Sequence, residues 1–139
     1  MKISRILAFM LIAAIAGLAP AAAEEAEVLK ITIDGDINPV SAMYIVKAIE
    51  RAEKEEYTCV IIQMDTPRGL LESTKSIVKE ILTARVPVVM FVAPSGSGAV
   101  SAGVFITLAC HVAVMAEGTN IGAPPGQRRG RRRYLQGDD

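Results

Sequence analysis

The sequence predicts an α/β fold, a parallel sheet built from repeated β-α-β units, and two observations lead to this prediction. Short runs rich in β-branched residues alternate along the chain with longer segments whose apolar residues keep helical spacing. Hydrophobic residues make up 51% of the 139 residues and aromatic residues only 4%, which favours an aliphatic α/β core over an aromatic-rich sandwich. Strands that alternate with helices in this way lie parallel and are joined by right-handed crossovers.

The first predicted unit occupies residues 28–56. The stretch VLKITI (Val28–Ile33) alternates and is rich in β-branched residues, as expected of a strand. After the turn DGDINP, the pair Asn38-Pro39 opens a helix, because proline fits the first helical position. That helix, VSAMYIVKAIERAEKEE, is amphipathic. Its predicted buried face consists of Ala42, Ile45, Val46, Ile49 and Ala52.

The remaining elements repeat this alternation. TCVIIQM (Thr58–Met64) is a continuous apolar run typical of a strand buried on both faces, and DTPRG ends it. LLESTKSIVKEILTA (70–84) is a second amphipathic helix, and VPVVMFV (Val86–Val92) is a third buried strand. GAVSAGVFITLAC (98–110) is a helix that starts with small residues, and HVAVMA (111–116) is a short fourth strand. The apolar side of the second helix consists of Leu71, Thr74, Ile77, Val78, Ile81 and Leu82.

Residues 1–23 are typical of a segment that directs export. Lys2 and Arg5 give a positive start, Ile6–Leu18 is apolar, and Ala21–Ala23 offers a cleavage site. A membrane span needs about 20 apolar residues, so this stretch favours a cleaved signal peptide over an uncleaved N-terminal anchor. Both interpretations place the rest of the chain outside the cytoplasm, secreted or membrane-attached.

Residues 124–139 (PPGQRRGRRRYLQGDD) do not continue the pattern of strands and helices. They have no periodicity, and five arginines fall within residues 128–133. Such a segment is either a basic arm for nucleic acid or anionic lipid, or a disordered tail that a changed reading frame or a truncation has added. An exported domain has little use for a nucleic-acid arm. We therefore expect a disordered tail and no nucleic-acid partner.

Two cysteines, Cys59 and Cys110, are too few for a disulfide framework. Each lies in an apolar run, so both are expected to be buried free thiols, with a single disulfide as the alternative in an oxidising compartment. The sequence contains no metal-ligand cluster, phosphate-binding glycine motif or dinucleotide fingerprint. We therefore expect neither a metal nor a cofactor.

Two loops are candidates for function, because functional loops of an open parallel sheet lie beyond the carboxyl ends of its strands. They are DTPRG and APSGSGAVSAG (93–103), and each follows a strand and precedes a helix. Unpaired N–H groups at a helix start can stabilise a developing negative charge. The second loop holds Ser95, Ser97 and Ser101, so a serine there would have an oxyanion site beside it.

Four blocks that include these loops resemble the NfeD-type membrane serine proteases. These are relatives of signal peptide peptidase A and of the Clp protease subunit, in the Clp-protease/crotonase superfamily. The blocks stand in family order and span about residues 28–123: IDGDINPVSAMYIVKAIERAE, IIQMDTPRGLLEST, VPVVMFVAPSGSGAVSAGVFI and AEGTNIGA. The resemblance implies a Clp-protease/crotonase-like domain at residues 24–123 that is incomplete at its C-terminus.

The resemblance also implies an activity and partners. It implies a serine endopeptidase of the Ser–Lys dyad type that acts on apolar segments of membrane-associated proteins. The implied partner is a stomatin-like membrane protein, with membrane association, and self-association into a homo-oligomer stays open.

The resemblance assigns roles to four residues. The family's nucleophile is the serine of an A-x-S-A-G-like block, which is Ser101 here. Its oxyanion hole uses the N–H that follows this serine, here Ala102, and one from a D-T-P-G-G loop, here Arg68 or Gly69. Arg68 stands where a glycine is common in the family, and its N–H can serve only at a permitted φ.

The general base is unassigned. The family's lysine follows the NIGA block, where desolvation lowers its pKa so that it can take the proton of the serine. This chain has no lysine after Lys79. The upstream lysines lie on polar helix faces and are interpreted as solvated charges: Lys47, Lys54, Lys75 and Lys79.

Four other polar residues near the loops are interpreted as structural. His111 is the single histidine. It lies ten residues after Ser101, which is about 15 Å along a helix and beyond hydrogen-bond reach. Asp65 ends a strand before Thr-Pro and is expected to fix that turn. Ser95 and Ser97 are expected to be loop and helix-cap residues.

Three functions follow from these observations. The first is a peptidase that acts through Ser101 but is inactive in this chain because its base is missing. The second is a crotonase-like protein whose oxyanion hole binds an acyl thioester, against which the export signal argues. The third is a truncated or frame-shifted fragment that binds without catalysis.

Overall fold

The computed structural model describes residues 26–123. The predicted export segment at residues 1–23 and the predicted tail at residues 124–139 lie outside these residues. No helix within residues 26–123 combines the length and the hydrophobicity needed to cross a bilayer.

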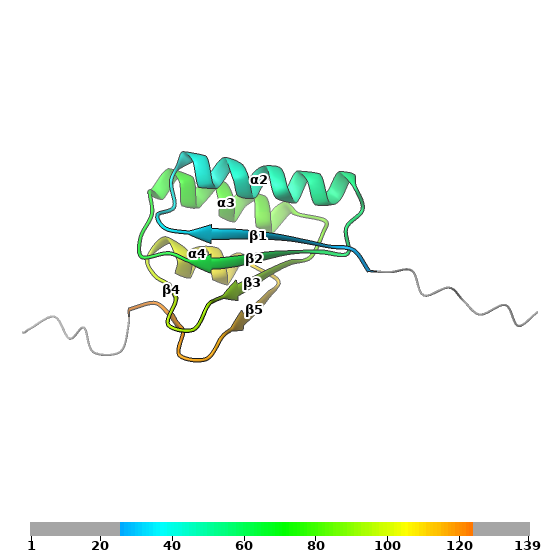
Figure 1. Cartoon of the computed structure of the whole chain (residues 1–139). Coiled ribbons are helices and arrows are strands. Elements are labelled where there is room, and N and C mark those ends of the chain that lie inside the picture. The colour runs from blue at the N-terminus through cyan, green and yellow to red at the C-terminus, as the bar shows by residue number, and fades with distance from the viewer. Residues whose placement is uncertain (1–25, 124–139) are drawn as a thin grey trace, which may run out of the picture.

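One parallel sheet organises the described chain. In chain order the elements are β1 (Val28–Asp34), α2 (Pro39–Lys54), β2 (Cys59–Asp65), α3 (Leu71–Thr83), β3 (Val88–Val92), β4 (Gly98–Ala99), α4 (Ala102–Ala109), β5 (Val112–Met115) and β6 (Asn120–Ile121). The sheet has the strand order β1-β2-β3-β5, and every pair is parallel (Figure 1). The predicted parallel α/β fold, with its first three strands adjacent, is therefore confirmed.

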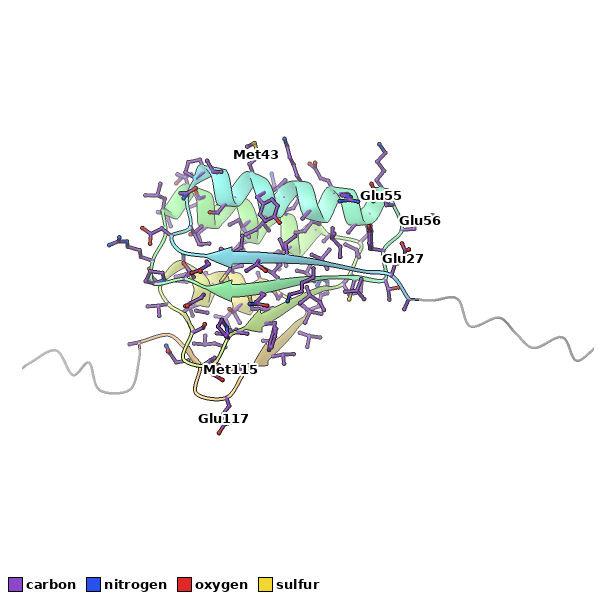
Figure 2. The ribbon with its side chains drawn as sticks, in the orientation of Figure 1. Glu27, Met43, Glu55, Glu56, Met115 and Glu117 are labelled. Atoms are coloured by element: carbon purple, nitrogen blue, oxygen red, sulfur yellow. The ribbon has the colours of Figure 1, made fainter. Side chains whose placement is uncertain are left out.

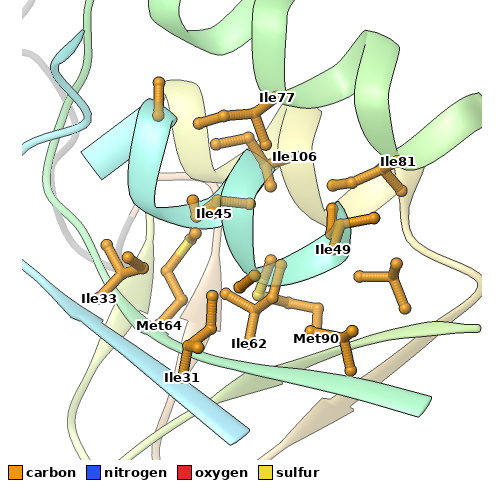
Figure 3. Packing of buried hydrophobic residues seen from close by; sticks show 14 of the residues in the cluster. Ile31, Ile33, Ile45, Ile49, Ile62, Met64, Ile77, Ile81, Met90 and Ile106 are labelled. Atoms are coloured by element: carbon orange, nitrogen blue, oxygen red, sulfur yellow. The ribbon is translucent and has the colours of Figure 1, made fainter. Parts of the chain in front are cut away.

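The core lies between the helices and one face of this sheet. Figure 3 shows aliphatic side chains of α2, α3 and α4 packed against those of β1, β2 and β3. The helices contribute Ile45, Ile49, Ile77, Ile81 and Ile106, and the strands contribute Ile31, Ile33, Ile62, Met64 and Met90. The predicted aliphatic character of the core is confirmed.

Strand β2 is buried on one face only, so the prediction of burial on both faces is wrong. Val60, Ile62 and Met64 are fully buried, whereas the residues between them are half-buried. The reason is that α2, α3 and α4 all pack on the same face of the sheet. The apolar run of β2 therefore reflects its central place between β1 and β3 rather than helices on both sides.

Strand β5 is an exposed edge. All four of its residues are exposed, and Val112, Val114 and Met115 have 50%, 46% and 45% of their surface accessible. Figure 2 shows Met115 on the side of the sheet away from Met43, which projects from the outer face of α2. An exposed apolar edge strand is prone to pair with other chains.

Helix α2 begins as predicted. The side-chain oxygen of Asn38 accepts hydrogen bonds from the N–H groups of Val40 and Ser41, at 2.9 and 3.1 Å, and Pro39 is the first helical residue. This arrangement satisfies two N–H groups that have no partner inside the helix. The buried residues of α2 are Ala42, Ile45, Ala48, Ile49 and Ala52. Val46, which was predicted to belong to the buried face, is half-buried.

The buried face of α3 is narrower than predicted. Leu71 and Leu82 are 66% and 69% exposed, so their predicted place in the core is wrong. The buried residues are Ser73, Thr74, Ile77 and Ile81. Thr74 can be buried because its hydroxyl donates to the carbonyl oxygen of Leu70 at 2.8 Å.

Helix α4 begins four residues later than predicted, at Ala102 instead of Gly98. Gly98 and Ala99 form β4, which pairs in parallel with β6. Hydrogen bonds to neighbouring strands satisfy backbone groups that a helix would otherwise have used. This short pairing shapes the candidate site described below.

We predict that the contact between Glu53 and Arg85 makes folding stability depend on pH. The Glu53 carboxylate accepts a hydrogen bond from the Arg85 N–H at 2.6 Å and pairs with the Arg85 guanidinium at 3.0 Å. These contacts hold the pKa of Glu53 below its usual range. A lowered folded-state pKa stabilises the fold above the unfolded-state pKa, and this stabilisation is lost as pH falls through the folded-state pKa. Glu53→Gln should therefore lower the urea midpoint at neutral pH and progressively less in acid.

The matched control for this prediction is Glu50→Gln, which removes an exposed carboxylate of the same helix that has no described ion-pair partner. Urea denaturation of wild type and both variants between pH 7 and pH 3 provides the measurement. A Glu53→Gln deficit that stays constant over this range would contradict the prediction.

Candidate active site

The two candidate loops meet at the carboxyl ends of β2 and β3. The Asp65 carboxylate accepts a hydrogen bond from the Gly98 N–H at 3.0 Å. The Thr66 N–H donates to the Gly98 carbonyl at 2.7 Å, and the Val100 N–H donates to the Thr66 carbonyl at 2.9 Å. The backbone just before Ser101 is therefore held against the end of β2. Asp65 fixes the neighbouring loop in addition to ending its own strand, which extends its predicted structural role.

The NIGA block (residues 120–123) supports the same loop from its other side. The Asn120 N–H donates to the Ser97 carbonyl at 3.2 Å, and the Gly122 N–H donates to the Ala99 carbonyl at 2.9 Å. Segments that are about 20 residues apart in sequence thus form a two-stranded parallel ladder beside the end of β2. Each strand of this ladder has only two residues. Two residues are too few to show a periodicity, so the ladder could not be predicted from the sequence.

Ser101 is exposed and occupies the N-cap position of α4 in a strained conformation. Its φ is 54° and its ψ is −107°, a region that costs a residue with a side chain about 1–3 kcal/mol. Its side chain makes no capping hydrogen bond to the helix, although serine is a common N-cap residue. The hydroxyl is therefore free to meet a ligand.

The N–H of Ala102 has no acceptor among the described residues. As the first residue of α4, Ala102 has no partner inside its own helix. The next two N–H groups are used, because Gly103 donates to Val100 at 3.0 Å and Val104 donates to Ser101 at 3.1 Å. The positive end of a helix dipole thus presents a free donor directly after Ser101.

The N–H of Gly69 also has no acceptor among the described residues, and Gly69 packs against Ala102. Ile37 pairs with the residues on either side of it: its N–H donates to Arg68 at 3.0 Å and its carbonyl accepts from Leu70 at 2.9 Å. In this parallel bridge the N–H of Gly69 itself is not used. A side-chain Cβ at position 69 would stand 2.5 Å from the Cβ atoms of both Ala102 and Ile37. The backbone of Gly69 therefore lies directly against Ala102, and only glycine fits there.

Arg68 adopts an ordinary backbone conformation. Among the described residues only Glu56 and Ser101 combine a side chain with a positive φ, so position 68 has no need of glycine. Its carbonyl is held by the N–H of Ile37 and the hydroxyl of Thr66, both at 3.0 Å. Its side chain pairs with Asp36, with 2.7 Å between Nε and Oδ2. The donor role expected of the Arg68 N–H requires a permitted φ at this residue. The structure meets this requirement.

Among residues 26–123, no side chain accepts a hydrogen bond from the Ser101 hydroxyl. The His111 Nδ1 accepts a hydrogen bond from the Val88 N–H at 3.1 Å, and the backbone N–H of His111 donates to the Val88 carbonyl at 3.0 Å. His111 therefore attaches β5 to β3 at the far end of α4, and its predicted structural role is confirmed. The four lysines at positions 47, 54, 75 and 79 are exposed as predicted, and Lys75 pairs with Glu72 at 2.9 Å.

The other serines and the cysteines are not aligned for catalysis. Ser95 is an exposed loop residue and Ser97 is buried. Neither caps α4, so the predicted helix-cap role is wrong. Cys59 and Cys110 are free as predicted but only half-buried. Burial raises the pKa of the Cys110 thiol to about 12, which keeps it protonated and unreactive near neutral pH.

Thr66 and Gly103 were not singled out from the sequence, although the site depends on their contact. A Cβ at position 103 would stand 2.7 Å from the Thr66 Cγ2 atom. The first turn of α4 therefore packs closely on the loop that follows β2. Within residues 26–123, no cluster of three or more His, Cys, Asp or Glu side chains is arranged to hold a metal ion.

The chain has a Clp-protease-like fold. A ClpP1 mutant from Listeria monocytogenes matches it with a TM-score of 0.57 at 22% identity, over 70% of this chain and 57% of that chain. At this identity the likeness shows the fold alone. More specifically, residues 27–128 match the family described as NfeD1b, N-terminal domain. The chain belongs to this family, and the predicted resemblance to NfeD-type proteins is confirmed.

Two further matches come from proteases. The chain is 37% identical over 91 residues to Membrane-bound protease PH1510 of Pyrococcus horikoshii, covering 66% of this chain and 21% of that protein. It is also similar to 1510-N, a membrane-bound stomatin-specific protease solved as a lysine-to-alanine mutant in complex with a substrate peptide. That match has a TM-score of 0.68 at 36% identity and covers 70% of this chain and 44% of that chain. The chain thus spans about a fifth of its curated relative and less than half of the solved chain.

We predict that the close contact at Gly69 is required for stability. Gly69→Ala would push a methyl group against Ala102 and Ile37, and overpacking of this kind costs about 1–3 kcal/mol. Leu71→Ala serves as the control, because Leu71 is 66% exposed two residues away and surface changes usually stay within about 0.5 kcal/mol. Urea denaturation measures both free energies of unfolding. Equal stability of the two variants would show that the loops are not in contact.

Proposed function

We propose that this chain is the N-terminal part of a serine endopeptidase domain of the Ser–Lys type, with Ser101 as the nucleophile. The N–H groups of Ala102 and of Gly69 or Arg68 form the oxyanion hole. The observation that carries the proposal is the strained and uncapped Ser101 beside a free helix N–H that packs against the glycine of a second loop. Strain of this kind at an exposed polar residue is typical of functional sites.

The proposed chemistry begins with attack of the Ser101 hydroxyl oxygen on a peptide carbonyl. The carbonyl oxygen becomes an oxyanion, and the two N–H donors stabilise it without any reorganisation of the protein. Donors from two different loops suit this role, because they can approach the oxyanion from two directions. Removal of a single such donor in enzymes of this kind costs about 100- to 1,000-fold in rate.

The proton of Ser101 needs an acceptor that residues 26–123 do not provide. His111 is engaged with Val88, and the lysines of α2 and α3 are exposed. A neutral serine hydroxyl is a weak nucleophile without a base. We therefore expect the lysine of the dyad to come from a segment that follows the NIGA block in relatives, and we expect negligible hydrolysis by the 139-residue chain.

The proposed substrate is an apolar segment of a membrane-associated protein, with a stomatin-like protein as the partner. The specificity of the similar protease 1510-N for stomatin supports this substrate class. Exposed apolar side chains near the candidate site also support it, since Leu70 and Phe105 are 57% and 63% exposed. Phe105 and Leu108 follow Ser101 at helical spacing, so they share its side of α4.

The proposed organisation of the chain follows from the same family. Residues 24–123 form part of the protease domain, and residues 1–23 direct export or anchor the protein. Residues 124–139, of which the family match includes 124–128, form a tail outside the pattern of strands and helices. The protein then acts outside the cytoplasm or at a membrane. A membrane-bound relative is consistent with this location.

A second candidate is a domain that binds peptides without cleaving them. The solved lysine-to-alanine mutant of 1510-N holds a substrate peptide, so a relative binds peptide when a lysine is replaced. A chain with no lysine after Lys79 would behave in the same way. The two candidates share one site and differ only in the presence of a base.

We predict that activity depends on both Ser101 and a downstream lysine. The test compares three proteins: the 139-residue chain, a fusion of its residues 24–123 to the lysine-bearing segment of the P. horikoshii relative, and that fusion with Ser101→Ala. Hydrolysis of a fluorogenic apolar peptide should be negligible for the first and measurable for the second. It should fall at least about 1,000-fold in the third, because loss of a nucleophile removes most of the rate.

Ser95→Ala in the same fusion is the matched control and should retain activity, because Ser95 is an exposed loop residue. Unchanged hydrolysis after Ser101→Ala would overturn the assignment of the nucleophile. Equal rates for the short chain and the fusion would overturn the requirement for a downstream lysine.

A further inference from the structure

The side chain of Asn120 closes a turn beside the loop that leads to Ser101. Its Nδ2 group donates a hydrogen bond to the Gly122 carbonyl at 2.8 Å. Gly122 has a φ of 95°, a conformation that glycine adopts without steric cost and other residues rarely do. Asn120 is half-buried. Its carboxamide therefore fixes the path of residues 120–122.

The same carboxamide lies against the backbone of Gly98. A Cβ at position 98 would stand 3.1 Å from the Asn120 Oδ1 atom and 3.4 Å from its Nδ2 atom. The first of these distances is tighter than an ordinary Cβ contact. The absence of a side chain at Gly98 thus lets the carboxamide rest on the chain three residues before Ser101.

Backbone hydrogen bonds join this turn to the loop. The Asn120 N–H donates to the Ser97 carbonyl at 3.2 Å, and the Gly122 N–H donates to the Ala99 carbonyl at 2.9 Å. Glycine is the most mobile residue type in a backbone, so Gly122 needs a restraint if it is to keep its bond to Ala99. The bond from the Asn120 side chain to the Gly122 carbonyl supplies that restraint.

The loop is thus held from two sides. The end of β2 holds one side, where Asp65 and Thr66 bond to Gly98 and Val100. The turn of Asn120 holds the other side. A positive φ at Ser101 costs free energy that surrounding contacts have to supply. The conformation of Ser101 therefore depends on both sets of contacts.

We propose that Asn120 is a positioning residue for Ser101. Its carboxamide keeps the β4–β6 ladder closed, and the closed ladder holds Ser101 at a positive φ. This inference rests on the proposed function, in which Ser101 is the nucleophile. Asn120 acts through Gly98 and Ala99 and has no need to touch the substrate. Without the carboxamide, Gly122 can rotate away from Ala99, and the chain before Ser101 can relax toward a negative φ.

Two variants remove this restraint. Asn120→Ala removes the carboxamide, and Asn120→Asp keeps its shape but replaces the Nδ2 donor with an oxygen. In both, the Gly122 N–H should exchange with solvent about 5-fold faster, because one side-chain hydrogen bond shifts a local opening equilibrium by about this factor. The nuclear Overhauser effect (NOE) between the H–N and Hα protons of Ser101 should weaken, because these protons lie closest when φ is positive.

The measurement is NMR spectroscopy of the ¹⁵N-labelled 139-residue chain. Glu56 serves as an internal reference, because its φ is 59° and it lies near the amino ends of the strands, away from Ser101 (Figure 2). In wild type the intraresidue NOE of Ser101 should match that of Glu56. In the two Asn120 variants it should fall to about half of the Glu56 value or less, while Glu56 itself does not change.

Thr119→Ala is the matched control. The Thr119 hydroxyl donates to the Ala116 carbonyl at 2.7 Å, so this variant also loses one side-chain hydrogen bond from a turn. Thr119 makes no described hydrogen bond to residues 97–101, and the Ser101 NOE and the exchange of Gly122 should therefore stay at wild-type values. Thermal unfolding of all variants separates a change at Ser101 from a general loss of stability.

The outcomes separate this inference from the proposed function. An unchanged Ser101 NOE in the Asn120 variants overturns the positioning role and leaves Ser101 as the proposed nucleophile. Equal weakening in Thr119→Ala also overturns that role, because the effect is then not specific to Asn120. A negative φ at Ser101 in wild type overturns both proposals. Weakening in the Asn120 variants alone supports the positioning role, whatever the hydrolysis test shows.

Discussion

The hydrogen bonds between the end of β2 and the loop before α4 are the constraint on which the site depends. Asp65 and Thr66 bind the backbone of Gly98 and Val100 at 2.7–3.0 Å. These contacts hold the backbone of residues 98–100 against the end of β2, directly before the start of α4. Ser101 then has to turn sharply into the helix, which accounts for its positive φ. The strain at Ser101 is thus imposed by contacts made one to three residues earlier.

The same end of the sheet decides which backbone groups stay unpaired. Ile37 forms backbone hydrogen bonds with the residues on both sides of Gly69. The Gly69 N–H is therefore left without a partner in the bridge. The start of α4 leaves the Ala102 N–H without one for a different reason, the geometry of a helix terminus. Gly69 packs closely on Ala102, so the backbones of these two residues lie against each other. Free donors beside an exposed hydroxyl are what the proposed oxyanion site requires.

One-sided packing explains the other unusual features of the structure. The helices α2, α3 and α4 share one face of the sheet, so the opposite face of β2 is half-buried and β5 is exposed throughout. The outer side of α4 is also apolar, with Phe105 and Leu108 at 63% and 76% exposure. The chain spans less than half of the solved protease that it resembles. The apolar outer side of α4 and the candidate site lie on the same helix, so what covers α4 also bears on access to Ser101.

Much of the fold could be predicted from local pattern because each main strand and helix is long enough to show its period. Isoleucines at helical spacing in α2 and β-branched runs in β2 and β3 predicted the parallel sheet correctly. The local sequence pattern predicted burial wrongly where burial depends on a neighbouring helix or strand. The exposure of Leu71 and Leu82 and the one-sided burial of β2 follow from the placement of α2 and α4, which no local period contains. The two-residue strands β4 and β6 are too short to have a pattern.

By itself, the sequence determined the class of fold, the capped start of α2 at Asn38, and the family motifs that single out Ser101 and the loop at Gly69. Those features are encoded in short stretches whose chemistry is local. Only the tertiary structure decided that Gly69 packs on Ala102, that Asp65 reaches Gly98, and that Arg68 pairs with Asp36. Each of these contacts joins residues more than 30 positions apart. Their geometry follows from parallel strands that bring distant loops to one edge of the sheet.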